Sequence, residues 1–141
     1  MTQYQASAEF AMSAESLWKT LRNFGDVSWL PGSPQPQFEG TGVGMIRSVV
    51  IPPLPIAREQ LDGIDEEART IRYHVIDGMP FPVKNYKASM QAVHLDEGRC
   101  RLVWSCSFEA DGISEEEACQ AIRELYDGVL THSRENLESR A

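Results

Sequence analysis

Between residues 37 and 110 the sequence alternates apolar and polar side chains with a period close to two, and only short turns interrupt it. Short turns join antiparallel neighbours, because a parallel pair needs a crossover of a dozen or more residues. The stretch therefore predicts one antiparallel sheet with a dry face and a wet face. The strands are expected over 37–40, 44–51, 56–64, 69–76, 84–95 and 99–110.

A long amphipathic helix is expected after this stretch, over 115–139, where the apolar residues fall on one stripe and charged residues take the other side. Ser114 and Glu117 stand in the register of a capping box at its start. Weaker patterns predict a first strand over 3–12 and a helix over 14–24, with a second short helical turn directly after it.

The order of these elements predicts an α+β fold in one domain spanning 1–141, a length that suits a single core. A curved antiparallel sheet has one dry face, and the C-terminal helix is the element able to cover it. The two short helices after the first strand are expected to close one end. A sheet curved around one helix need not fill the space between them.

Hairpin register tests whether the apolar faces agree. For the last hairpin it pairs apolar or aromatic residues throughout: Ala92–Leu102, Met90–Trp104, Ala88–Cys106 and Tyr86–Phe108. For the earlier strands it places Arg47 opposite Glu59 in the middle of an otherwise apolar face. Such a pair is either a satisfied internal salt bridge, a polar anchor for a bound molecule, or a sign that the face is assigned wrongly.

Large side chains on the inward faces are candidates to line a ligand cavity, because aromatic rings with polar tips among apolar walls are typical of small-molecule pockets. A solid core is the alternative. Together with Arg47 and Glu59, the predicted ligand-binding residues are Trp29, Tyr73, Phe81, Tyr86, Met90, Trp104, Phe108 and Tyr126.

Two connections between strands are unusually apolar and rich in proline, "PPLP" at 52–55 and "GMPFPV" at 78–83. Rigid apolar loops at the mouth of a cavity suit a lid. They suit equally well a cover that packs on the helix and completes the core. A polyproline ligand is disfavoured, because a hairpin tip is a poor host for an extended peptide.

The net charge of −8, from 21 acidic and 13 basic residues, repels phosphate backbones and anionic headgroups. We therefore expect no nucleic-acid partner, and no membrane insertion because no apolar run is long enough. Cys100, Cys106 and Cys119 lack metal-ligand spacing and indicate reduced thiols of a cytoplasmic protein. Neither a metal site nor a cofactor is expected.

Several short motifs follow one another in a recognisable order: "WLP" at 29–31, "GVGMIR" at 42–47, "REQL" at 58–61, "IRY" at 71–73, "PVKNY" at 82–86 and "LVWS" at 102–105. Over about 3–138 their order and spacing resemble the polyketide cyclase/dehydrase family of the START-like superfamily. The resemblance implies a helix-grip fold, with seven strands wrapped around the C-terminal helix and a pocket for a small hydrophobic molecule. It matches the family's recurring positions at Trp29, Arg47, Glu59, Tyr73, Tyr86 and Trp104.

Three classes of function are compatible with this sequence. The first is a binding protein for a small lipid-, polyketide- or aromatic-like molecule, with Arg47 anchoring a carboxylate or phenolate. The second is a cyclase or dehydratase with Glu59 as general base and Arg47 or Tyr73 stabilising an enolate. Against it, an adjacent arginine stabilises the charged carboxylate and weakens it as a base. The third is a protein-interaction module, which nothing in the sequence requires.

Overall fold

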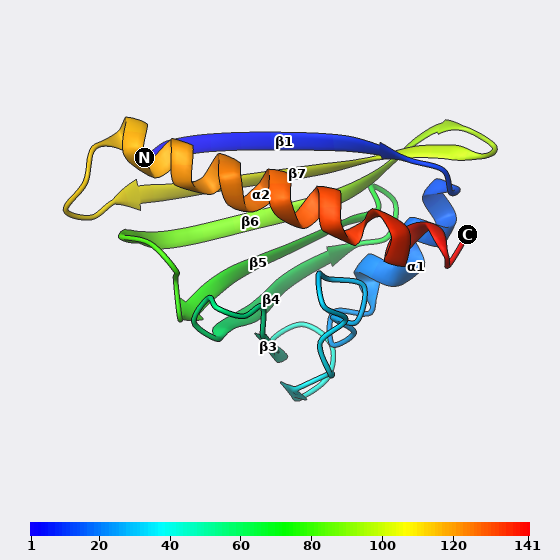
Figure 1. The fold of residues 1–141 in the computed structure, drawn as a ribbon. Coiled ribbons are helices and arrows are strands. Elements are labelled where there is room, and N and C mark those ends of the chain that lie inside the picture. The colour runs from blue at the N-terminus through cyan, green and yellow to red at the C-terminus, as the bar shows by residue number, and fades with distance from the viewer.

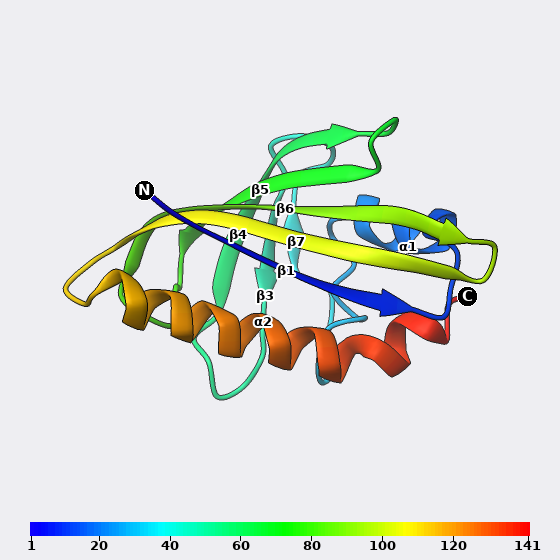
Figure 2. The same cartoon turned by 90° about the horizontal axis from the view of Figure 1, so that it is seen from above.

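The computed structural model describes residues 1–141 as a seven-stranded antiparallel sheet with two helices (Figure 1). Its strands follow the order β1-β7-β6-β5-β4-β3-β2. Helix α2 runs along one face of the curved sheet, and α1 lies near the C-terminal end of α2 (Figures 1 and 2). The elements are β1 (Thr2–Phe10), α1 (Ala14–Arg22), β2 (Phe38–Glu39), β3 (Ile46–Val49), β4 (Ala57–Asp65), β5 (Thr70–Asp77), β6 (Val83–Asp96), β7 (Arg99–Ala110) and α2 (Glu115–Glu138).

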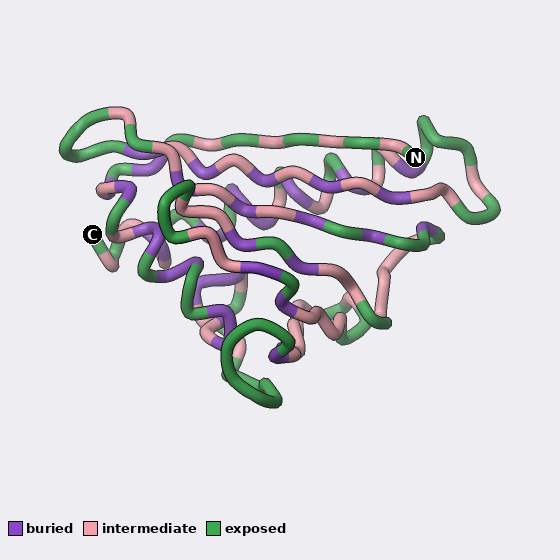
Figure 3. The backbone as a smooth tube through the Cα atoms, turned by 180° about the vertical axis from the view of Figure 1, so that it is seen from behind, coloured by how far each residue is buried: buried purple, intermediate pink, exposed green.

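The predicted α+β helix-grip architecture is confirmed, and the local signals behind it are visible in the structure. Buried and accessible residues alternate along the strands, as the period of two predicts (Figure 3). Ser114 caps α2 by accepting a bond from the Glu117 backbone, and the Glu117 side chain returns to Ser114. Neither helix combines the length and apolar character needed to cross a bilayer.

The second short helix expected after α1 does not form. Hydrogen-bonded turns take its place, from Asp26 N to Asn23 O and from Leu30 N to Val27 O. The Asp26 carboxylate accepts bonds from the backbone and hydroxyl of Ser28, which offers this segment an alternative to helical bonding. The proline that follows Leu30 also disfavours the helical region there.

The predicted registers are mostly confirmed. Ala92, Met90 and Ala88 pair with Leu102, Trp104 and Cys106, and Arg47 pairs with Glu59. The predicted Tyr86–Phe108 pair is absent, because the register shifts between Lys84 and Lys87. Asn85 lies in this bulge with φ of +54°. The prediction assumed that the residue numbers of paired residues add up to a constant along the hairpin. An extra residue in one strand breaks this rule and cannot be detected by it.

Candidate ligand-binding cavity

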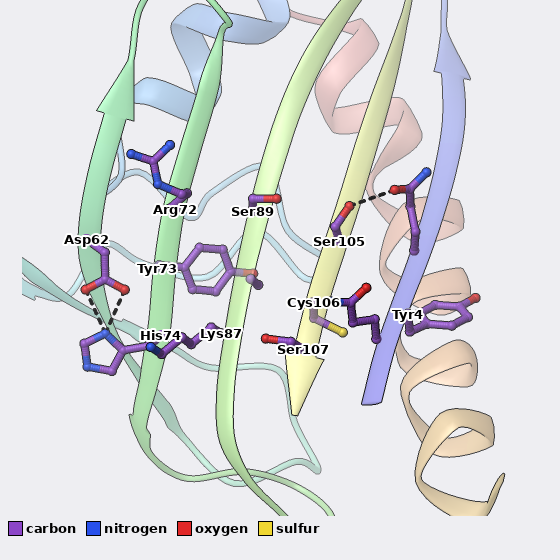
Figure 4. Close-up of a pocket in the computed structure, with 13 residues that line it drawn as sticks. Tyr4, Asp62, Arg72, Tyr73, His74, Lys87, Ser89, Ser105, Cys106 and Ser107 are labelled. Atoms are coloured by element: carbon purple, nitrogen blue, oxygen red, sulfur yellow. Dashed lines mark hydrogen bonds and ion pairs between the residues drawn. The ribbon is translucent and has the colours of Figure 1, made fainter. Parts of the chain in front are cut away.

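Two hollows on the sheet have opposite character. The larger, about 920 Å³, is an open depression on the outer face across β1 and β4–β7 (Figure 4). Polar side chains dominate its lining and partly pair with each other, as in the contacts of His74 Nδ1 with Asp62 at 2.9 Å and of Ser105 Oγ with Gln5 at 3.1 Å. It is the wet face that the alternation predicted. The volume is large because this depression is open to solvent. We therefore place the candidate site in the second hollow.

The second hollow is a partly open cavity of about 80 Å³ between the sheet and α2. Thirteen of its 17 lining residues are hydrophobic, which is the composition expected of a small-molecule site. The lining comprises Leu30, Arg47, Val49, Ile51, Leu54, Pro55, Ala57, Glu59, Tyr73, Val75, Met79, Pro80, Tyr86, Met90, Trp104, Leu125 and Val129.

Both proline-rich loops contribute to this cavity, through Ile51, Leu54 and Pro55 on one side and Met79 and Pro80 on the other. These side chains line the cavity together with residues of β3, β4 and β5. The apolar residues that are unusual for surface loops are therefore explained by what they face.

The bases of the two loops touch at Gly78, whose φ is +87°. A Cβ on this residue would lie 2.0 Å from the Ile56 carbonyl oxygen, so only glycine permits the approach.

Arg47 and Glu59 form the predicted ion pair at the polar end of the cavity. Arg47 Nε donates to Glu59 Oε1 at 2.8 Å and Nη1 donates to the Phe24 carbonyl oxygen at 3.2 Å. The two side chains are 4% and 12% exposed. The guanidinium also lies 3.9 Å from the centroid of the Phe24 ring and 5.2 Å from that of Tyr73. Arg47 thus joins β3 to the segment after α1 while it faces the cavity.

Tyr73 supplies a neutral hydroxyl to the same cavity. Its oxygen accepts a hydrogen bond from Trp104 Nε1 at 3.0 Å. Burial raises the pKa of Tyr73 well above its ordinary value, the Glu59 charge raises it further, and Arg47 opposes both. The phenol therefore keeps its proton, and since its oxygen already accepts, that proton is what it offers a ligand.

A second aromatic layer lies beneath Trp104. Its ring stacks on that of Tyr126 with centroids 3.5 Å apart and an angle of 4° between planes. The Tyr126 hydroxyl is hydrogen-bonded to the Tyr86 hydroxyl. Burial raises the pKa of both tyrosines well above the ordinary value. The wall of the cavity thus rests on a fully buried polar contact.

The structure brings many of the predicted site residues together at this cavity and leaves others outside it. Arg47, Glu59, Tyr73, Tyr86, Met90 and Trp104 line it, and Trp29, Phe81, Phe108 and Tyr126 do not.

Each residue outside the cavity has a different place. Trp29 is buried in the turns after α1, where its carbonyl accepts a bond from Asn136 Nδ2. Phe108 is buried in the core, and Phe81 packs against the core beside the cavity-lining Pro80. Tyr126 lies behind Trp104.

The sequence reasoning missed the residues of α2 that face the cavity, Leu125 and Val129. Tyr126 belongs to the same apolar stripe of α2. Its neighbour Leu125 and, one turn further on, Val129 face the cavity instead. Large rings were favoured as lining residues because of their polar tips. In this cavity branched aliphatic residues and proline make up most of the wall.

The present volume limits what the cavity holds. A space of about 80 Å³ admits a few waters, whereas sites for drug-sized ligands occupy roughly 300–1,000 Å³. A larger occupant would therefore require the covering loops to move.

A curved antiparallel sheet gripping a C-terminal helix, with an apolar cavity between them, defines the helix-grip class of START-like proteins. The chain belongs to one family within it: residues 1–138 match the family described as polyketide cyclase/dehydrase and lipid transport. The suspected resemblance is thereby confirmed. No curated protein sequence matches the chain.

Solved structures agree on the fold. The protein XoxI from Bacillus cereus aligns with a TM-score of 0.80 and 25% identity over 97% of this chain and 96% of that chain. Norcoclaurine synthase from Thalictrum flavum, in complex with dopamine and hydroxybenzaldehyde, aligns at 0.65 and 20% identity over 88% and 76%. Ara h 8.0201 aligns at 0.71 and 18% identity over 98% of both chains. At these identities the last two establish the fold alone.

Proposed function

We propose that this domain binds a small hydrophobic molecule, lipid-, polyketide- or aromatic-like, in the cavity between the sheet and α2. The observation that carries the proposal is a partly open space with apolar walls and one polar end, formed by Arg47, Glu59 and Tyr73. Ligand binding in general is a property of the family. The free thiols are consistent with a cytoplasmic setting.

Under this proposal the loops that contain residues 52–55 and 78–83 act as the lid. They line the cavity with Leu54, Met79 and Pro80, which would contact a ligand bound there. Their contact at Gly78 fixes how they meet.

Native mass spectrometry of the freshly purified protein tests the proposal directly. A surplus mass present under native and absent under denaturing conditions is the expected result, and the released molecule identifies the ligand class.

Ala57→Phe, which fills the cavity, should remove the surplus mass. Ala68→Phe, on an exposed turn, is the matched control and should retain it. A surplus mass retained by Ala57→Phe would place the ligand elsewhere.

An enzyme of the cyclase or dehydratase type is the second candidate, favoured by the position of Glu59 beside Tyr73 at one cavity end. In that mechanism Glu59 removes a proton and Arg47 or Tyr73 stabilises the enolate. The bond from Arg47 to Glu59 argues against it, because Glu59 Oε1 would have to leave Arg47 before it could take a proton. Full turnover by a Glu59→Gln variant would rule this mechanism out.

A further inference from the structure

The ion pair at the polar end of the cavity is only half satisfied by the protein. Arg47 uses Nε and Nη1, and Glu59 uses Oε1. Arg47 Nη2 and Glu59 Oε2 make no hydrogen bond within the chain, although the two side chains are only 4% and 12% exposed. Both residues line the cavity, so a ligand meets one unused donor group and one unused acceptor side by side.

We propose that the cavity selects an uncharged, mostly apolar molecule that carries a hydrogen-bond acceptor next to a donor, such as an amide or a hydroxy-carbonyl group. The acceptor takes a bond from Arg47 Nη2, and the donor gives one to Glu59 Oε2. This inference rests on the proposed function and specifies the chemistry that the same site takes.

The charge balance of the ion pair favours this uncharged ligand over the carboxylate or phenolate that Arg47 alone would suggest. Glu59 already neutralises Arg47 at 2.8 Å. An anionic ligand would therefore bring a net negative charge into an apolar cavity, next to a carboxylate that repels it. It would also leave Glu59 Oε2 without a donor. An uncharged donor–acceptor group satisfies both atoms and adds no charge.

The rest of the lining agrees with this chemistry. Tyr73 offers one further donor from a hydroxyl that already accepts from Trp104, so a ligand oxygen can take bonds from two sides. The other polar hydroxyl of the wall, on Tyr86, is engaged with Tyr126. Everything else around the cavity is carbon-rich, which favours one polar group on an otherwise apolar ligand. Because the volume is only about 80 Å³, a single-ring probe needs less movement of the loops than a larger ligand.

Three single-ring probes of nearly equal shape separate the possibilities: benzamide, acetophenone and benzoate. Benzamide accepts and donates, acetophenone accepts only, and benzoate is an anion at neutral pH. Calorimetric or ligand-observed NMR titration of the full chain should give the tightest binding for benzamide and the weakest for benzoate. We expect about tenfold between those two, the effect of one unpaired polar group.

Glu59→Gln tests the cause of the preference, because it removes the neutralising charge and keeps an acceptor for Arg47 Nε. The ratio of benzamide to benzoate affinity should then fall by about tenfold. Asp77→Asn removes the same charge from an exposed pair on the outer face, and the ratio should stay as in the unmodified chain.

Each outcome bears on a different claim. Tightest binding by benzoate in the unmodified chain would overturn the uncharged ligand and leave a hydrophobic binding protein intact. Failure of all three probes would overturn the ligand chemistry stated here, whereas a missing native adduct bears on the proposed function itself. Because the order of the probes is read on the unmodified chain, the test stands even if Glu59→Gln folds poorly.

Discussion

Strand β4 carries two ion pairs on consecutive residues, and they face opposite sides of the sheet. Glu59 points inward and pairs with Arg47 of β3, with side chains 12% and 4% exposed. Arg58 points outward and pairs with Asp77 of β5 at 3.2 Å, with side chains 38% and 56% exposed. The chemistry of the two pairs is the same, so the difference between them is the surroundings.

The difference in exposure indicates the role of each pair. The charges of the outer pair lose little hydration when they pair, so this pair contributes little to the free energy of unfolding. The inner pair loses several kcal/mol of hydration per ion, and apolar residues of similar volume would often fill the space at least as well. Stability alone therefore does not account for an arginine and a glutamate at this position. A polar end for a cavity does account for them.

Breaking only one side of the inner pair should produce the largest effect. Arg47→Met leaves the Glu59 carboxylate buried without its partner, and we expect a loss of about 3–5 kcal/mol in the free energy of unfolding. Urea denaturation followed by circular dichroism measures it. A loss below about 1 kcal/mol would mean that water reaches Glu59 freely and that the inner pair resembles the outer one.

Removing both partners sharpens the same comparison. The double variant Arg47→Met, Glu59→Leu buries no charge, so its stability should return to within about 1 kcal/mol of the unmodified chain or exceed it. Binding of benzamide should nevertheless be lost. A stable double variant that still binds the probe as before would separate the ion pair from ligand recognition.

The contrast between the faces was largely predictable from the sequence, and the cavity was predictable only in part. Alternation and short turns place Arg47 opposite Glu59, because the register and the face of each side chain both depend on pairing between neighbouring strands. Whether side chains from α2 and the loops fill the enclosed space depends on long-range packing, which no local period encodes. Hence Tyr126, on the correct helix stripe, lies behind Trp104, while Leu125 and Val129 reach the cavity.

Raising the pH should lower the stability of the folded protein through its buried tyrosines. Burial raises the pKa of Tyr73, Tyr86 and Tyr126 above the value of 10.0 expected in the unfolded chain. A raised folded pKa contributes stability that is complete below pH 10 and is lost as the pH rises above it. At pH 11 the loss is about 1.4 kcal/mol per tyrosine. Denaturation midpoints between pH 8 and 11 should fall accordingly, and midpoints that stay constant would show that these phenols ionise in the folded protein.

Tyr86→Phe should have a smaller effect, because it leaves a single buried hydroxyl, that of Tyr126, without its partner. We expect a loss of about 1–3 kcal/mol. Tyr4→Phe is the matched control: Tyr4 packs edge-on against Tyr126 and is only partly buried, so its change should stay within about 0.5 kcal/mol. Equal losses for the two variants would show that the buried hydroxyl pair contributes no more than the hydroxyl of the partly buried Tyr4.

The smallest effect is expected at the outer pair. Arg58→Ala removes one partner of Asp77, but water replaces it, so the free energy of unfolding should fall by about 0.2–1 kcal/mol. The loss should shrink further in 0.5 M salt, because exposed charges are screened. The loss caused by Arg47→Met should persist in the same salt, since ions do not enter an apolar cavity. If salt instead reduced both losses equally, the two pairs would have the same surroundings, and the case for Arg47 and Glu59 as the polar end of a binding site would lose its physical basis.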